Sequence, residues 1–238
     1  MDSPRGFFDN SWLAVERGSV DAISKTLELS ELRTVTWSEG LNAVCGDFWD
    51  AELEGNAALS RVFITPEVSG WRLAVGGWLG GDGGRRATAT ICSSSHPGPI
   101  VVPSEEGGVS LDEIARYCRE LSATFGAAHA FTEQGRMDWY QWILASGGVI
   151  QRLYCWNGKA LRDEGDMPEV ERRIHERDGT EEGWEPNTGD VGAIAGHYSI
   201  DPDLVDLSTP SVGVGFLGTT RWGRDHGVPK RDLRGENR

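Results

Sequence analysis

Apolar positions recur at three- and four-residue spacing in one segment, which predicts a single long amphipathic helix. Ser110 and Glu113 form a capping box, in which each side chain accepts a hydrogen bond from an unpaired backbone N–H of the first turn. Gly126 is a residue type that commonly ends a helix. The sequence therefore predicts a helix over about 110–125, with one apolar face formed by Leu111, Ile114, Cys118, Leu121 and Phe125.

Runs of β-branched, aromatic and alternating apolar residues predict strands on both sides of this helix. We expect strands before it over 61–66, 71–79 and 87–92, and after it over 128–132, 137–145 and 149–156. A glycine-rich strand over 212–217 is expected to be the last one.

The strands over 137–145 and 149–156 are predicted to form a hairpin. Gly147-Gly148 lies between them, and glycine tolerates the positive φ of tight turns. Because apolar residues occupy both faces, we expect a central strand pair covered on each side. On the first strand, Trp139 and Ile143 should point one way and Tyr140, Trp142 and Leu144 the other. On the second strand, Val149, Leu153 and Cys155 should lie opposite Ile150, Tyr154 and Trp156.

Shorter helices are expected over 20–27, from Ser38, over 168–177 and from a cap at Asp190. The predicted fold class is α+β, a curved and mainly antiparallel sheet with the long helix packed across it and smaller helices at the ends. We expect a flexible N-terminus (1–10), a single domain (11–222) and a disordered basic tail (223–238).

Composition narrows the class of protein further. Ten Trp among 238 residues supply large side chains for a core. No stretch approaches the roughly 20 apolar residues of a membrane helix, and the first ten residues do not resemble a signal peptide. The net charge of −14 opposes binding to phosphate, so nucleic acid is not an expected partner. We expect a cytoplasmic protein with no membrane contact, and its oligomeric state stays open.

Cysteine and histidine positions favour no metal site. Cys45, Cys92, Cys118 and Cys155 form none of the close pairs that zinc sites use, and they are expected to be free thiols. The glycine-rich run over 76–84 has no phosphate-binding Lys, and no nucleophile motif is present. We therefore expect no cofactor.

Acidic residues are concentrated in one segment. Between Asp163 and Asp190 lie eleven Asp and Glu against three Arg, a balance of 3 − 11 = −8 out of a total of −14. Such a surface attracts cationic partners. The side chains expected to bind a basic protein partner are Asp163, Glu164, Asp166, Glu169, Glu171, Asp178, Glu181 and Glu182.

Short patterns in the middle of the chain resemble a family of uncharacterised bacterial proteins. The resemblance spans about 30–217 and implies no activity, because that family has no established one. The residues that carry it are Trp37-Ser-Glu-Gly-Leu41, Phe63-Ile-Thr-Pro66, Gly70-Trp71-Arg-Leu-Ala-Val-Gly76, Leu121-Ser122, Phe125-Gly126, Trp142, Asp163-Glu164-Gly165 and Ser199-Ile-Asp-Pro202.

Two classes of function remain open, with oligomerisation as a structural third. The leading hypothesis is a non-catalytic acidic binding protein, of an immunity, adaptor or regulatory type. The alternative is a small-molecule enzyme or ligand-binding protein with a pocket between the long helix and the Trp-rich sheet, where His129, Glu133 or Tyr140 acts as acid or base. The expected pocket residues are Trp71, His129, Glu133, Trp139, Tyr140, Trp142 and Tyr154.

Overall fold

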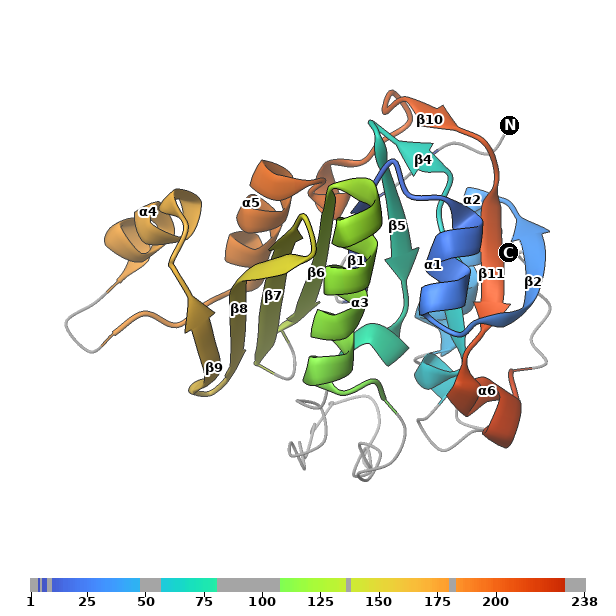
Figure 1. Cartoon of the computed structure of the whole chain (residues 1–238), viewed down its shortest axis with the longest axis horizontal. Coiled ribbons are helices and arrows are strands. Elements are labelled where there is room, and N and C mark those ends of the chain that lie inside the picture. Colours follow the sequence, from blue (N-terminus) through green and yellow to red (C-terminus); the bar gives the residue numbers. More distant parts are fainter. Residues whose placement is uncertain are drawn as a thin grey trace, which may run out of the picture.

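One large antiparallel sheet organises the chain (Figure 1). The computed structural model describes residues 4, 6–7, 10–47, 57–80, 108–135, 138–179 and 183–229. Nine strands lie in the order β2-β11-β3-β5-β1-β6-β7-β8-β9, and β4 and β10 form a short ribbon at one end of it. The strands are β1 Ser11–Glu16, β2 Ser30–Val35, β3 Arg61–Ile64, β4 Glu67–Val68, β5 Trp71–Val75, β6 Ala127–Gln134, β7 Trp139–Ser146, β8 Val149–Asn157, β9 Ala160–Gly165, β10 Ser211–Val212 and β11 Gly215–Thr219.

Helices cover both faces of the sheet, which gives three layers. The helices are α1 Val20–Thr26, α2 Trp37–Asp47, α3 Leu111–Phe125, α4 Glu169–Asp178, α5 Thr188–Tyr198 and α6 Arg221–His226. Side chains of α1, α3 and α6 pack into the core on one face, and those of α2, α4 and α5 pack into the core on the other. The predicted fold class, α+β with a mainly antiparallel sheet, is confirmed.

The long helix is formed as predicted. Glu113 N–H donates to Ser110 Oγ at 3.2 Å, and Ser110 N–H donates to Glu113 Oε2 at 3.3 Å, which completes the capping box. Gly126 ends the helix with a φ of 97°, a conformation that a side chain would strain. The helix lies across β1, β6, β7 and β8.

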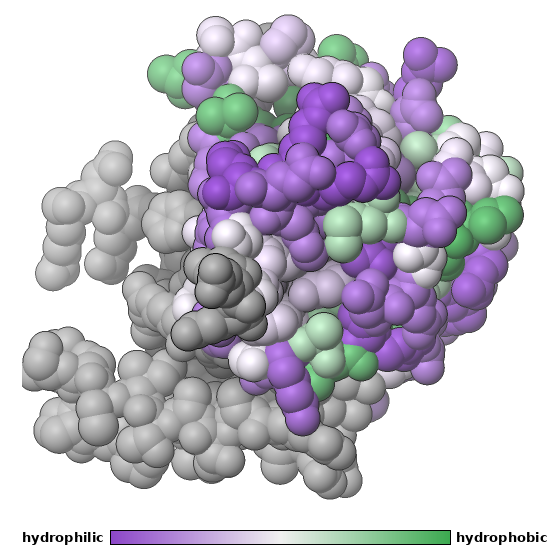
Figure 2. All heavy atoms as spheres, turned by 90° about the vertical axis from the view of Figure 1, so that its left-hand side faces the viewer, coloured by the Kyte–Doolittle hydropathy of each residue, from purple (hydrophilic) through white to green (hydrophobic). Residues whose placement is uncertain are grey.

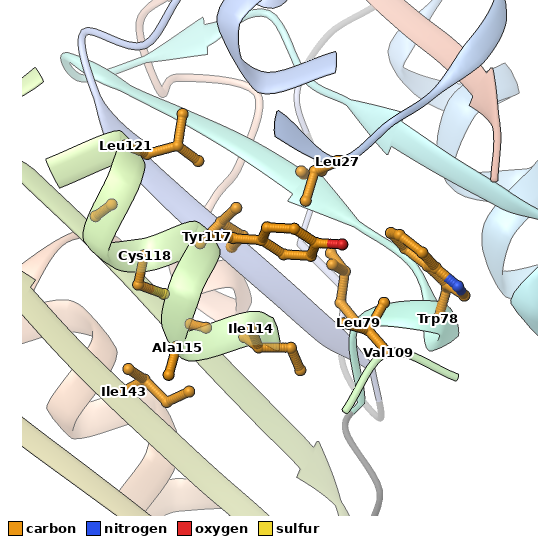
Figure 3. Close-up of a cluster of buried hydrophobic side chains, with 14 of the residues drawn as sticks. Leu27, Trp78, Leu79, Val109, Ile114, Ala115, Tyr117, Cys118, Leu121 and Ile143 are labelled. Atoms are coloured by element: carbon orange, nitrogen blue, oxygen red, sulfur yellow. The ribbon is translucent and has the colours of Figure 1, made fainter. Parts of the chain in front are cut away.

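The space between α3 and the sheet is filled by side chains. Ile114, Cys118 and Leu121 on α3 share one core with Ile143 of β7. Figure 3 shows Ala115 and Cys118 on the side of Ile143, while Ile114 points toward Leu79 and Val109. Tyr117 extends sideways toward Leu27 and Trp78, and these side chains are buried. Close packing therefore occupies the region where one sequence hypothesis located a ligand pocket.

The β7–β8 hairpin confirms most of the predicted side-chain directions. Trp139, Ile143, Leu153 and Cys155 lie on the α3 face, and Tyr140, Trp142, Leu144 and Tyr154 lie on the opposite face. The prediction was wrong for Ile150, which packs into the α3-side core. A register shift opposite Leu144 and Ala145 inserts an extra residue in β8. The side chains at the start of β8 therefore point to the face opposite to the one that simple alternation predicts.

Three strands carry no clear sequence signal. β2 and β9 are the outermost strands of the nine, and their side chains are mostly exposed, so their residues do not alternate between apolar and polar. β1 is apolar on both faces and so shows no alternation, although it is a central strand between β5 and β6. The strand expected over 87–92 lies outside the described residues.

Several element boundaries differ from the predictions. The strand expected over 71–79 ends at Val75, and a 3-10 turn over Gly77–Gly80 follows it. The last strand is divided into β10 and β11 at Gly213, which has a φ of 94°. Asn187, and not Asp190, caps α5, while Asp190 is the acidic partner in the capping box. α6 occupies the first part of the segment expected as a disordered tail, and Trp222 packs into the core.

None of the helices in the described ranges combines the length and apolar character needed to cross a membrane.

We predict that Ile114→Ala lowers the free energy of unfolding by about 2–5 kcal/mol, because it leaves a cavity in the α3-side core. Leu161→Ala is the control, since Leu161 is exposed on β9 and its truncation should change stability by about 0.5 kcal/mol or less. Urea unfolding measures both. Equal effects of the two substitutions would contradict the close packing of α3 on the sheet.

Candidate functional site

A buried arginine connects the sheet to the acidic segment. Arg152 on β8 is 1% exposed and points toward α4. Its Nε donates to Glu171 Oε2 at 2.9 Å and its Nη2 donates to Glu171 Oε1 at 2.5 Å. Its Nη1 donates to Asp163 Oδ1 on β9, also at 2.5 Å. We call Arg152, Glu171, Asp163 and Trp142 the arginine cluster.

The cluster satisfies the hydrogen-bonding groups of its buried carboxylate. Glu171 is fully buried, and its Oε2 also accepts a hydrogen bond from Trp142 Nε1 at 3.0 Å. Arg152 Nη1 donates further to the backbone oxygens of Glu164 and Gly165 at 3.3 Å. A bidentate pair between a guanidinium and a carboxylate is among the stronger hydrogen-bonded ion pairs. The cluster therefore fixes β8, β9 and α4 relative to one another.

Local sequence explains how these groups meet. Arg152 and Tyr154 are two residues apart on β8 and so share the face that α4 covers. The register pairs Tyr154 with Asp163, which brings the Asp163 carboxylate to the same place. α4 begins after Pro168 and buries Glu171 and Ile174.

Burial disfavours the charged guanidinium of Arg152, but its hydrogen bonds to Glu171 and Asp163 outweigh burial and raise its pKa above the ordinary value. Arg152 therefore stays protonated, and it neutralises the buried carboxylate beside it. A group held in one charge state does not transfer protons, so the arginine cluster is suited to a structural role and not to acid–base catalysis.

Aromatic rings enclose the cluster. Trp142 stacks on Tyr154 with ring centroids 4.4 Å apart. Trp184, in the segment before α5, contacts Trp142 edge-on at 6.0 Å, and His175 of α4 lies 3.8 Å from the Trp184 ring. Burial lowers the pKa of His175, which favours its neutral form. The rings cover the ion pair from water and strengthen it.

The acidic residues predicted to bind a partner are largely paired with arginines. Glu164 binds Arg162, Glu169 binds both Arg172 and Arg173, and Asp178 binds Arg177. Asp163 is exposed but paired with Arg152, and Asp166 is exposed. Glu181 and Glu182 lie outside the described residues.

Glu171 requires a correction. The sequence analysis placed it on a solvated acidic surface, but it has no exposed area and cannot contact a partner. The reason is the helical period, which turns Glu171 and Ile174 toward the sheet while Glu169 and Glu176 stay outside.

The residues of the expected pocket do not lie between the long helix and the sheet. Only Trp139 is on the α3 face, where its Nε1 donates to Gly80 O at 3.0 Å. The others are on the opposite face, under α4 and α5, because strand residues alternate in direction. These others are Trp71, His129, Glu133, Tyr140, Trp142 and Tyr154.

The proposed acid and base are also far apart. His129 and Glu133 are four residues apart on β6, a separation of roughly 13 Å along a strand. Phe131 lies between them on the same face. His129 instead joins a ring cluster with Trp71 at 5.5 Å and Tyr198 at 5.7 Å. These residues belong to a core, and His129 and Glu133 do not converge as a catalytic pair.

No metal centre is evident in the described part of the chain, and two surface hollows lie away from the expected pocket. Within the described ranges, no group of three or more His, Cys, Asp or Glu could hold a metal ion. A surface hollow of about 300 Å³ lies between α1 and α3, and another of about 260 Å³ lies beside β2 and β11. Neither includes a residue of the expected pocket. Cys118 and Cys155 are buried free thiols, and Cys45 is free and partly buried, as predicted.

Sequence reasoning missed Arg152, His175 and Trp184. Arg152 is the one charged residue in the strand over 149–156 and was an available signal, because a buried cation requires a buried anion. The sequence also holds a signal for the acidic surface, which is the absence of Lys and Arg over a long segment. From Asp178 to Thr220 the chain has eight Asp and Glu and no Lys or Arg, a balance of 0 − 8 = −8.

The fold and the site define an α+β protein with an open antiparallel sheet and a buried arginine cluster beside its acidic segment. No protein-family model, curated protein or solved structure matches the chain.

We predict that Arg152→Leu lowers the free energy of unfolding by about 3–5 kcal/mol, because it leaves Glu171 charged and unpaired in the core. The double variant Arg152→Leu/Glu171→Leu should recover much of that loss, since it removes both buried charges. Arg116→Ala, which breaks an exposed pair with Glu120, is the control and should cost about 1 kcal/mol or less. A double variant less stable than Arg152→Leu alone would contradict this account.

We predict a pH-dependent loss of stability from His129. Burial lowers the pKa of His129 to about 4, and Ala145 N–H donates to its Nδ1, so the folded state keeps the ring neutral. The unfolded chain binds a proton near pH 6.5. Stability therefore falls between pH 6.5 and pH 4, by about 3 kcal/mol from this residue.

Chemical unfolding at a series of pH values tests this prediction. His129→Gln removes the titrating ring, so its stability should fall less steeply with decreasing pH than that of the wild type. His197→Gln is the control, because His197 is exposed and its replacement should leave the slope unchanged. A wild-type slope retained in His129→Gln would show that His129 is not responsible.

Proposed function

We propose that the protein is a non-catalytic binding module, of an immunity, adaptor or regulatory type, that recognises a basic protein partner. The main support is the absence of any Lys or Arg over 178–220, a segment with eight Asp and Glu of which Asp190 is buried. This segment continues the acidic one that starts at Asp163, and clefts and faces of one charge sign concentrate partners of the opposite sign. The same proposal places the module in the bacterial cytoplasm.

Figure 2 views the molecule from the side that bears α4 and β9, and its described surface there is mainly hydrophilic. The exposed carboxylates of this flank include Asp166, Glu176 and Glu185. We define these three residues as the acidic flank. The arginine cluster holds β9 and α4 against the sheet, so most of the flank is presented on a fixed backbone and loses little entropy on binding.

Internal ion pairs reduce the charge of this side but leave it competent for binding. The pairs of Glu169 with Arg172 and Arg173 are exposed at both partners. Exposed pairs of this kind contribute at most about 1 kcal/mol. An arginine from a partner can therefore replace an internal one at small cost, whereas the buried pair of Arg152 with Glu171 stays intact.

The catalytic alternative has less support. The groups suggested as acid and base, His129 and Glu133, are separated by Phe131 on one strand face. His129 is neutral and enclosed by rings, and its expected pocket is not between α3 and the sheet. General acid–base chemistry needs groups within hydrogen-bonding reach of one substrate. Recognition by charge fits the geometry better.

Binding to a small basic protein such as cytochrome c tests this proposal. The variant Asp166→Asn/Glu176→Gln/Glu185→Gln neutralises the acidic flank and should slow association about fivefold at low salt, because steering by charge acts mainly on the association rate. The wild-type association rate should itself fall about tenfold between 50 and 300 mM NaCl as the charges are screened.

A charge-matched control separates a local site from overall charge. Asp21→Asn/Glu28→Gln/Asp225→Asn removes an equal number of charges from exposed positions on α1, just after α1 and on α6. This control should change the association rate by about twofold or less, because its charges lie away from the flank. Equal effects of the two triple variants, or binding that is insensitive to salt, would contradict the proposal.

A further inference from the structure

Large apolar side chains are exposed together in one short stretch of the chain. Leu204 is 76% exposed, Leu207 78%, Val212 70% and Val214 51%. The described part of the chain exposes three other large hydrophobic residues, which are Leu32, Val149 and Leu161, and these are scattered over β2, β8 and β9. Four exposed apolar side chains within eleven residues exceed ordinary surface scatter. We call residues 204–214 the apolar strip.

The apolar strip has a fixed backbone. Pro202 just before the strip and Val205 within it are buried and anchor its start. Asp201 Oδ1 accepts a hydrogen bond from Asp203 N–H at 3.0 Å, and Asp206 Oδ1 accepts one from Ser208 N–H at 2.8 Å. The exposure of its leucines and valines is therefore built into the fold and does not come from a loose chain.

The strip ends in a short edge strand. β10 pairs with β4 at one end of the sheet, and within the described residues β10 has no second strand beside it (Figure 1). Residues 211–214 are all exposed. An edge strand offers unpaired backbone groups to which an extended peptide can add, while side-chain contacts supply specificity.

Charge around the strip selects the kind of partner. Asp203 and Asp206 are exposed within or beside it, and the chain has no Lys or Arg from Asp178 to Thr220. Glu67 on β4 lies opposite Val212, but its charge is offset by Arg72. A second copy that approaches through its own strip, or an anionic lipid surface, would bring like charge against the strip.

We propose that the apolar strip docks an extended segment of a basic protein partner, in which Lys or Arg alternates with apolar residues. The segment adds to the free edge of β10, its apolar side chains cover the exposed leucines and valines, and its cations face Asp203 and Asp206. This inference rests on the proposed function and identifies where the apolar contact with the same partner is made. Such contacts carry most of the binding energy of an interface, whereas rim charges mainly set the rate.

A labelled twelve-residue peptide that alternates Lys with Val is the probe, and its binding is measured by fluorescence anisotropy. Leu204→Ser/Leu207→Ser should weaken binding about tenfold or more. The matched control Val149→Ser/Leu161→Ser also removes two exposed apolar side chains and should retain wild-type affinity. A peptide that alternates Glu with Val should bind at least about tenfold more weakly to the wild type.

Each other outcome overturns the inference. Wild-type affinity in Leu204→Ser/Leu207→Ser would show that the strip is not the docking surface, and equal losses in the control would show general adhesion to apolar surface. Dimerisation in sedimentation experiments that Leu204→Ser/Leu207→Ser abolishes would assign the strip to a second copy. If the peptide results fail while the acidic flank still controls binding of cytochrome c, the proposed function stands and this inference alone is wrong.

Discussion

Burial of the central strands on both faces is the constraint on which the rest of the structure depends. Trp12, Leu13, Ala14 and Val15 on β1 are completely buried, alternately in the core under α3 and in the core on the opposite face. A sheet with two apolar faces needs a layer of helices on each side. The positions of α3 on one side and of α4 and α5 on the other follow from that requirement, and so does the location of the acidic segment.

The arginine cluster follows from this arrangement, because polar groups must cover the sheet where apolar ones are lacking. Near the edge of the sheet the second layer is an acid-rich helix, α4, which has little apolar surface to bury. Ile174 contributes one apolar contact, and the pairing of Arg152 with Glu171 supplies a defined orientation at this position. A buried ion pair adds little net stability compared with apolar packing, but a mismatched arrangement would leave a charge unpaired. The cluster therefore specifies how α4 is placed more than how tightly it is held.

The sequence predicted those elements that depend on interactions between residues close together in the chain. The capping box at Ser110, the end of α3 at Gly126 and the glycine pair of the β7–β8 hairpin each involve residues close in sequence, and the structure forms them. β2 and β9 could not be found in this way, because edge strands owe their structure to a partner strand and not to an alternating pattern. For the candidate site, the sequence identified Asp163, Glu171, Trp142 and Tyr154 under two separate hypotheses. Only the register of β8 with β9 and the rotation of α4 show that they meet at Arg152.

The same charge distribution explains how an apolar surface can stay exposed. Four large apolar side chains on the strip would favour self-association if the surrounding charges were balanced. The strip and the sequence on either side of it carry carboxylates and no Lys or Arg, so two copies that approach through their strips bring like charges together. A partner of opposite charge is attracted electrostatically and not repelled, so the apolar contact can form. Repulsion between copies and attraction of a basic partner thus follow from one feature of the sequence, the absence of Lys and Arg between Arg177 and Arg221.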